Sequence, residues 1–356
     1  MLPPASTALR DLARFLAAIC LGSLGGWAFW TLHSPLPWLL GSMVVCAAAS
    51  IVGLPVSSPR SARPPMQVLV GTMLGSSFTL KTFANVTEWI VPLAVLVVFL
   101  FFGSALGYFM LRRIGGFDRP TAFFAGVPGG LMEMTILGGE KGGDERVIAL
   151  AHAARIFFVV LFLPFLLQLA IGQPLPRSVG VPVPLSAMNV PDSAWFGGIY
   201  ALGFLFAHLV KMPGRYMFAP LILSAAAHLS GVTDFVLPSA FLAGAQVIIG
   251  TVIGCRFVGL AKRTVAHAMG LSVLTTAMLL AVTFFFAGAV SYVTGLPFAS
   301  LVLAYSPGGL PEMSLIALAL SGNVAFVVVH HMVRVALVVT ISPWVFKAMS
   351  KRSPSP

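Results

Sequence analysis

The chain repeats one pattern of residues after an interval of 179 positions. Residues 128–134 read Pro-Gly-Gly-Leu-Met-Glu-Met, and residues 307–313 read Pro-Gly-Gly-Leu-Pro-Glu-Met. The same shift, without a gap, also pairs polar residues outside this motif: Gln67 with Gln246, Thr72 with Thr251, His152 with His331, and Arg155 with Arg334. A repeat of this length predicts that the two halves share one fold.

Composition places this duplicated chain in a membrane. Hydrophobic residues make up 58% of the 356 and charged residues only 9%, whereas soluble domains carry roughly a quarter of charged residues. Apolar runs that could cross a hydrocarbon layer of about 30 Å as helices recur along the chain. We therefore predict an all-α polytopic membrane protein, with candidate segments at 12–32, 36–53, 66–80, 89–111, 120–138, 148–171, 195–210, 216–231, 239–255, 268–290, 299–318 and 324–346.

The repeat also divides the chain into regions. We predict a first repeat over residues 1–173, a Pro-rich linker over 174–194 and a second repeat over 195–356. The run at 12–32 could be read as a signal peptide, but it is long, carries tryptophans at its far end and lacks a small-residue cleavage pattern. We expect it to be retained as a membrane span.

The distribution of Lys and Arg decides between two topologies, because these residues concentrate in cytoplasmic loops. If all twelve segments cross the membrane, eleven basic residues face the cytoplasm and eight face outward. If residues 120–140 and 299–322 instead enter the membrane and return as re-entrant hairpins, 17 are cytoplasmic and only Lys81 and Arg177 lie outside. The charge bias therefore favours the hairpins.

Five crossings in each half would turn the second half upside down relative to the first. The sequence thus predicts two inverted repeats, each of five transmembrane helices and one re-entrant Pro-Gly-Gly hairpin. Both termini would lie on the cytoplasmic side of a bacterial inner membrane. Broken elements at the centre of an inverted repeat are typical of secondary transporters.

The two Pro-Gly-Gly breaks supply the first candidate site residues. Proline removes a backbone donor and the glycines permit a tight reversal, and such backbone at membrane depth is tolerated only against protein or a water-filled cavity. If helices restart at Leu131 and Leu310, Glu133 and Glu312 lie in first turns that favour an anion. The predicted substrate- or ion-binding set comprises Pro128, Gly129, Gly130, Glu133, His152, Arg155, Pro307, Gly308, Gly309, Glu312, His331 and Arg334.

Each arginine of this set follows a histidine by three residues, so the two side chains share one helical face. A buried arginine needs a carboxylate or backbone carbonyls around it. Three interpretations remain open. The breaks could be simple packing bends. Alternatively, Glu133–Arg155 and Glu312–Arg334 could form buried ion pairs with a purely structural role, which we call the strut interpretation. Alternatively, the arginines bind an anionic substrate while the glutamates or histidines handle a coupling proton or Na⁺.

A second candidate set lies upstream, at Gln67, Thr72, Gln246 and Thr251. These residues belong to stripes of small residues for which close helix packing is the simpler role, although their polar groups could also line the cavity. No metal or other cofactor is predicted. The three cysteines and the adjacent His330 and His331 have no metal-ligand spacing.

With its doubled Pro-Gly-Gly-x-x-Glu-Met and downstream His-x-x-Arg elements, the chain resembles the AbrB membrane protein family, which is built from the AbrB duplication unit. The resemblance covers nearly the whole chain. That family is distantly similar to the cation/proton antiporter and anion transporter group, including glutamate and citrate symporters with five-span inverted halves. The resemblance implies a binding site between 128–133 and 307–312.

Family members also carry the labels ammonia monooxygenase and AbrB regulator of gene expression. A monooxygenase needs a copper or iron ligand set, and a DNA-binding regulator needs a soluble module. We expect instead a secondary active transporter that is not an enzyme. It would move a small solute by alternating access, coupled to H⁺ or Na⁺, and the solute would be an anion if the arginines bind it. The alternative is a membrane sensor or scaffold that affects gene expression indirectly, and a membrane monooxygenase is the least favoured class.

The expected partners follow from that function. They are a small-molecule or ion substrate and the lipid bilayer, and no nucleic acid, because the basic residues are scattered over loops. A homodimer is left open.

Overall fold

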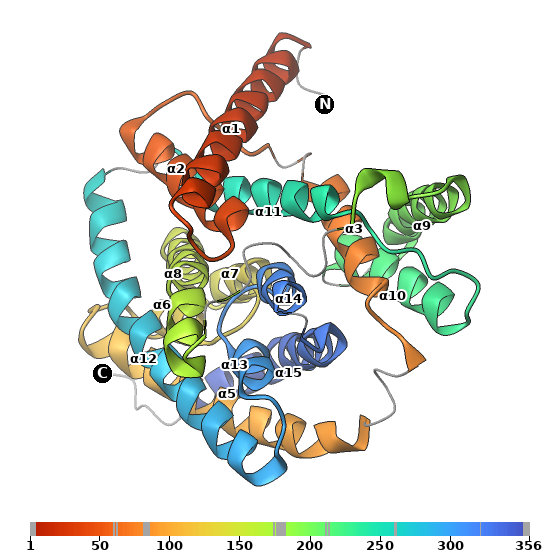
Figure 1. Ribbon diagram of the computed structural model, residues 1–356. Helices are drawn as coiled ribbons and strands as arrows, with labels where there is room; N and C mark the ends of the chain where they lie inside the picture. Colours follow the sequence, from red (N-terminus) through yellow and green to blue (C-terminus); the bar gives the residue numbers. More distant parts are fainter. Residues whose placement is uncertain are drawn as a thin grey trace. The chain divides into compact units, whose positions relative to one another are not determined.

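The computed structural model describes residues 5–59, 61, 63–80, 86–173, 175, 183–210, 212, 214–259, 262–320 and 322–351. These residues form helices and no β-strand (Figure 1), so the predicted all-α class is confirmed. Lys81, Arg177 and the first part of the predicted linker, residues 174 and 176–182, lie outside the described residues.

Six helices of the described residues are long and apolar enough to cross a membrane: Leu9–Thr31, Val86–Arg113, Glu145–Ile171, Ser239–Phe257, Met269–Thr294 and Val324–Ser350. The ten crossings expected from the sequence stay a prediction. Helices α2 (Pro37–Val52), α3 (Arg63–Gly75) and α10 (Arg215–Leu229) are shorter. At 1.5 Å per residue they rise about 20 to 24 Å, less than the roughly 30 Å of a hydrocarbon core.

The helices of the second half repeat those of the first at the sequence shift. The pairs are α1 (Ala5–Thr31) with α9 (Val190–Leu209), α2 with α10, α3 with α11 (Ser239–Gly254), α5 (Ile90–Arg113) with α12 (Lys262–Thr294), α6 (Arg119–Gly126) with α13 (Phe298–Tyr305), α7 (Leu131–Glu140) with α14 (Leu310–Ala319), and α8 (Glu145–Ile171) with α15 (Val324–Lys351). Around the Pro-Gly-Gly breaks the helix ends agree to the residue. The duplication therefore extends to local structure.

Helix α9 begins inside the range predicted as linker. Pro191 lies in its first turn, where a proline costs no hydrogen bond, and the Asn189 side chain caps the helix by accepting from the Asp192 amide at 2.7 Å. A proline-rich composition therefore does not by itself exclude a helix start.

The described residues form two compact units, and each unit combines segments from both repeats. Unit 1 comprises Met1–Asn85, Pro164–Leu260 and Ser314–Ala325, and unit 2 comprises Val86–Leu163, Ala261–Met313 and Phe326–Pro356. Unit 1 thus holds the early helices of both repeats. Unit 2 holds both Pro-Gly-Gly breaks and both His-x-x-Arg elements.

Unit 1 is held together by close helix crossings at glycines. Helix α2 packs against α11, and its repeat counterpart α10 packs against α3, the counterpart of α11. A Cβ at Gly250 of α11 would meet the Leu39 carbonyl oxygen of α2, and a Cβ at Gly71 of α3 would meet the Met217 carbonyl oxygen of α10. The stripes of small residues therefore have the packing role anticipated for them, in both copies.

This packing predicts different outcomes for two identical substitutions in α11. Gly250→Ala should lower the midpoint of thermal unfolding, because its methyl group collides with α2 backbone, including the Met43 amide nitrogen at 3.0 Å. Such overpacking costs about 1–3 kcal/mol. Gly244→Ala is the matched control, since a Cβ there meets nothing within 4 Å, and alanine favours a helix by about 1 kcal/mol over glycine. Equal melting of the two purified variants would contradict this account.

Unit 2 is organised around the two broken segments. Helix α5 packs against α6, its counterpart α12 packs against α13, and α5 and α12 also pack on each other. Helices α6 and α13 have 8 residues, and α7 and α14 have 10. At 1.5 Å per residue, each rises only about 12 to 15 Å, roughly half of a hydrocarbon core.

Candidate functional site

The first break leaves backbone carbonyls without helical donors. The last regular bond of α6 runs from the Val127 amide to the Phe123 carbonyl at 3.1 Å. The next donor would come from residue 128, but Pro128 has no N–H. The Phe124 carbonyl, which that bond would have satisfied, is therefore left inside the protein. A buried carbonyl without a donor costs about 1–3 kcal/mol.

His152 satisfies this carbonyl from α8. Its Nε2 lies 2.9 Å from the Phe124 oxygen, and the imidazole is fully buried. Because a carbonyl only accepts, Nε2 must carry the hydrogen. The Phe124 carbonyl, which loses its backbone donor at Pro128, thus receives a side-chain donor from a residue 28 positions later.

Arg155, one turn further along α8, holds the rest of the break. Its Nη1 donates to the Val127 carbonyl at 3.2 Å and more weakly to the Ala125 carbonyl at 3.4 Å. Its Nη2 donates to Nδ1 of His152 at 2.5 Å, so the histidine is neutral, with its hydrogen on Nε2. Arginine, histidine and broken backbone form one connected network.

The second break has the same network. His331 Nε2 lies 2.9 Å from the Leu303 carbonyl, the one that Pro307 leaves without a donor. Arg334 donates to the carbonyls of Ser306 and Gly308, the latter at 2.7 Å, and to Nδ1 of His331 at 3.1 Å. In both copies the histidine and the arginine each reach a carbonyl 28 residues upstream. The network therefore belongs to the duplicated unit itself.

Both glutamates lie in the first turn after the break, as predicted. Helices α7 and α14 begin at Leu131 and Leu310. A Cβ at Gly130 would overlap the Glu133 carboxylate, and a Cβ at Gly309 would overlap the Glu312 carboxylate. In both copies the glutamate thus folds back over the second glycine of its motif, close to the positive end of the helix dipole.

The two copies differ in how the glutamate relates to the arginine. The described contacts of Arg155 are to carbonyls and to His152, and no ion pair with Glu133 is among them. In the second copy the Glu312 carboxylate, which is 5% exposed, interacts electrostatically with Arg334. The strut interpretation thus has support at Arg334, whereas at Arg155 the partners are backbone carbonyls.

The remaining candidates belong to unit 1. Thr72 donates to the Val68 carbonyl at 2.9 Å, and its own carbonyl accepts from Ser224 at 2.9 Å. Thr251 is fully buried and accepts from the Cys46 thiol at 3.7 Å. Gln246 is 2% exposed, and its Nε2 has no hydrogen-bond partner within the described residues. Gln67 is half-buried.

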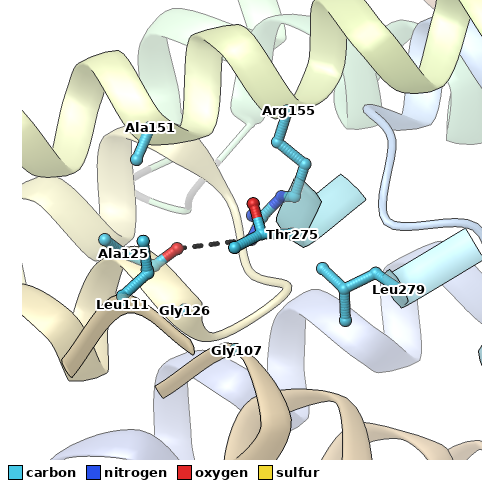
Figure 2. Close-up of a pocket in the computed structure, with 8 residues that line it drawn as sticks. All are labelled: Gly107, Leu111, Ala125, Gly126, Ala151, Arg155, Thr275 and Leu279. Carbon is cyan, nitrogen blue, oxygen red and sulfur yellow. Dashed lines mark hydrogen bonds between the residues drawn. The ribbon is translucent and has the colours of Figure 1, made fainter. Parts of the chain in front are cut away.

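Sequence reasoning missed one feature of unit 2, a small pocket beside Arg155 (Figure 2). It has room for about one water molecule. Helices α5, α6, α8 and α12 line it, and both Arg155 of α8 and Thr275 of α12 are among the lining residues. The signal in the sequence was indirect: Gly107, Gly126 and Ala151 are small where the second half has large residues.

Comparison with known proteins agrees with these repeated motifs. The sequence profile of the AbrB family, described as "Transition state regulatory protein AbrB", matches residues 38–350. The chain is 24% identical to the Bacillus subtilis (strain 168) protein named "Uncharacterized protein YhjN", over 94% of this chain and 92% of that protein. It is also 24% identical to the Escherichia coli (strain K12) protein named "Putative regulator AbrB", over 92% of this chain and 93% of that protein. A profile match over most of the length, which spans both copies of the motif, shows that the chain belongs to the AbrB family.

Proposed function

We propose that the protein is a secondary active transporter of a small solute, coupled to H⁺ or Na⁺ by alternating access. The observation that carries this proposal is the duplicated helix break of unit 2, in which a buried arginine and histidine replace the backbone donors lost at proline. Interrupted helices at membrane depth are built around solute and ion sites in many transporters.

The location of the arginines supports the same function. Arg155 and Arg334 each lie ten residues after the start of a helix that is long and apolar enough to cross a membrane. At 1.5 Å per residue both guanidiniums are about 15 Å along the helix, near the midplane if the helix spans the bilayer. Charged groups at that depth are costly and are rarely kept without a use.

The proposed architecture is a pair of inverted repeats in a bacterial inner membrane, with both termini cytoplasmic. In it, residues 120–140 and 299–322 enter from opposite sides as re-entrant hairpins. The half-length helices on each side of both breaks fit such hairpins, because neither arm is long enough to cross alone. The presence of both breaks in unit 2 fits one moving block that carries the solute.

Flux into proteoliposomes tests this function. Purified protein would be reconstituted and challenged with formate, acetate, glutamate, citrate and ammonium under imposed ΔpH or Na⁺ gradients. The double variant Glu133→Gln, Glu312→Gln should reduce gradient-driven flux to the level of empty liposomes, because it removes both carboxylates at the breaks. The control is Glu88→Gln, Glu140→Gln, which alters two exposed carboxylates elsewhere. Undiminished flux in the first double variant would overturn the assigned roles.

A second candidate function is suggested by the names of the matched family and of one relative. The family description and the name of the Escherichia coli relative both speak of regulation. On this account the protein would be a membrane sensor or scaffold that acts on gene expression through a partner. A purified protein that captures a cytosolic partner but moves no solute in the flux assay would support the sensor and contradict the transporter.

A further inference from the structure

We propose that the pocket beside Arg155 binds a small monovalent anion, and that only the first copy of the repeat has this site. The inference rests on the proposed function and deepens it by naming the chemical class of the solute or co-solute. Figure 2 shows Arg155 extending from α8 toward the Ala125 carbonyl, and Thr275 of α12 lines the same pocket. All of the lining residues belong to unit 2.

The first argument is the unbalanced charge of Arg155. The side chain is 4% exposed, and the partners of its guanidinium within the described residues are two carbonyls and a neutral histidine. A guanidinium has five N–H donors, and Nε has no hydrogen-bond partner in the described part of the chain. Since a buried charge without a counter-charge is costly, an anion in the adjacent space would be strongly favoured.

Repulsion between the two arginines further favours an anion beside Arg155. Arg155 and Arg334 interact electrostatically, and Glu312 acts on Arg334. Among the described residues of unit 2, the buried side chains with a formal charge are these two arginines and the single carboxylate of Glu312, which leaves one buried positive charge unbalanced. Arg334 has that carboxylate, so the charge that needs an anion is Arg155.

The second argument is that the equivalent space in the other copy is filled. At the repeat shift, Gly126 becomes Tyr305 and Ala151 becomes His330, and both of these side chains are fully buried. The Tyr305 hydroxyl donates to the Pro92 carbonyl at 2.8 Å, and its ring stacks on Phe99. Large side chains thus fill, in the second copy, the space that forms the pocket in the first copy.

The pocket in the first copy depends on two glycines. A Cβ at Gly126 would lie 2.7 Å from the Gly107 carbonyl carbon, so the backbones of α5 and α6 touch there. At the shifted position of Gly107 the chain has Phe286, which packs on Phe99 with ring centroids 5.9 Å apart. Small residues bring the backbone together in one copy and large aromatic residues fill the other.

The dimensions and donors of the pocket define the ligand. Room for about one water molecule suits a single-atom anion such as chloride, and it is too small for an organic acid; nitrate and formate test how far the pocket can widen. Thr275 adds a second donor, because its hydroxyl, which now donates to the Leu271 carbonyl at 3.0 Å, can rotate toward a ligand. The other lining residues are glycine, alanine and leucine, which bring no competing charge.

The experiment compares anion-dependent stabilisation of the full chain in two pocket-filling variants. Both copy the other half of the chain: Ala151→His introduces the residue found at 330, and Thr275→Leu the residue found at 96. The protein would be purified in gluconate buffer, and the unfolding midpoint followed while chloride, nitrate or formate is added. The wild type should show a saturable rise of several degrees with at least one anion. Both variants should lose that rise, each measured against its own midpoint in gluconate.

Each outcome decides the proposal. A rise that does not saturate, or that Ala151→His and Thr275→Leu retain in full, would assign the effect to general salt action and overturn the site. Absence of any rise in the wild type would also overturn it. If a variant fails to fold, the other, on a different helix, provides the comparison. Saturable binding together with silent proteoliposomes would leave the anion site standing and reject the transporter.

Discussion

Arg334→Leu is expected to prevent recovery of a folded protein, whereas Arg155→Leu should fold and melt at a moderately lower temperature. Both substitutions strand backbone carbonyls that the guanidinium now satisfies, that of Ala125 in the first copy and those of Ser306 and Gly308 in the second, at about 1–3 kcal/mol for each group. Only Arg334→Leu also removes the cation that acts on the buried Glu312. Loss of one partner of a buried charge pair costs about 3–5 kcal/mol, which is a large part of a total stability of roughly 5–15 kcal/mol.

The measurement is the monodisperse yield of each variant in detergent, followed by thermal unfolding of whatever is recovered. Ala336→Leu serves as the control, because this residue is exposed on the same helix as Arg334. Arg334→Lys should fall between wild type and Arg334→Leu, since an ammonium retains the charge but lacks the planar fork that joins two carbonyls. Equal yields and midpoints for Arg155→Leu and Arg334→Leu would contradict the difference between the two copies.

The sequence predicted the local structure around the breaks because the responsible effects are local. Proline and glycine determine where helices stop and restart, so the starts at Leu131 and Leu310 could be named in advance. The repeat shift also transferred each boundary from one half to the other. The all-helical class followed from composition in the same direct way.

The partners of the arginines could not be predicted from the sequence. Whether a buried arginine meets a carboxylate or carbonyls depends on which backbone groups lie near it, and the glutamate next to the break suggested an ion pair. One clue was available: Pro128 and Pro307 must leave the carbonyls of Phe124 and Leu303 without donors. The histidines that satisfy those carbonyls are 28 residues away in both copies, a separation that only tertiary packing reveals.

Three-dimensional packing also sets the division into units and the open pocket. The sequence halves and the compact units are different partitions, because each unit combines matching helices of both repeats. The pocket exists because α5 and α6 meet at Gly107 and Gly126. Comparing the two halves position by position would have shown glycine opposite Phe286 and Tyr305, but only the structure tells which positions share one space.

Opposite-side labelling of two equivalent loops tests the central claim, which is that the two halves are inverted across the membrane. Asp144 and Asn323 occupy the same position in the repeat, directly before α8 and α15, and both are exposed. Each would be replaced by cysteine in a chain whose own Cys20, Cys46 and Cys255 are removed. Intact cells and inverted vesicles would then be treated with a membrane-impermeant maleimide. The proposed topology predicts that Asp144→Cys is labelled only from the cytoplasmic side and Asn323→Cys only from the opposite side, whereas labelling of both from one side would contradict it.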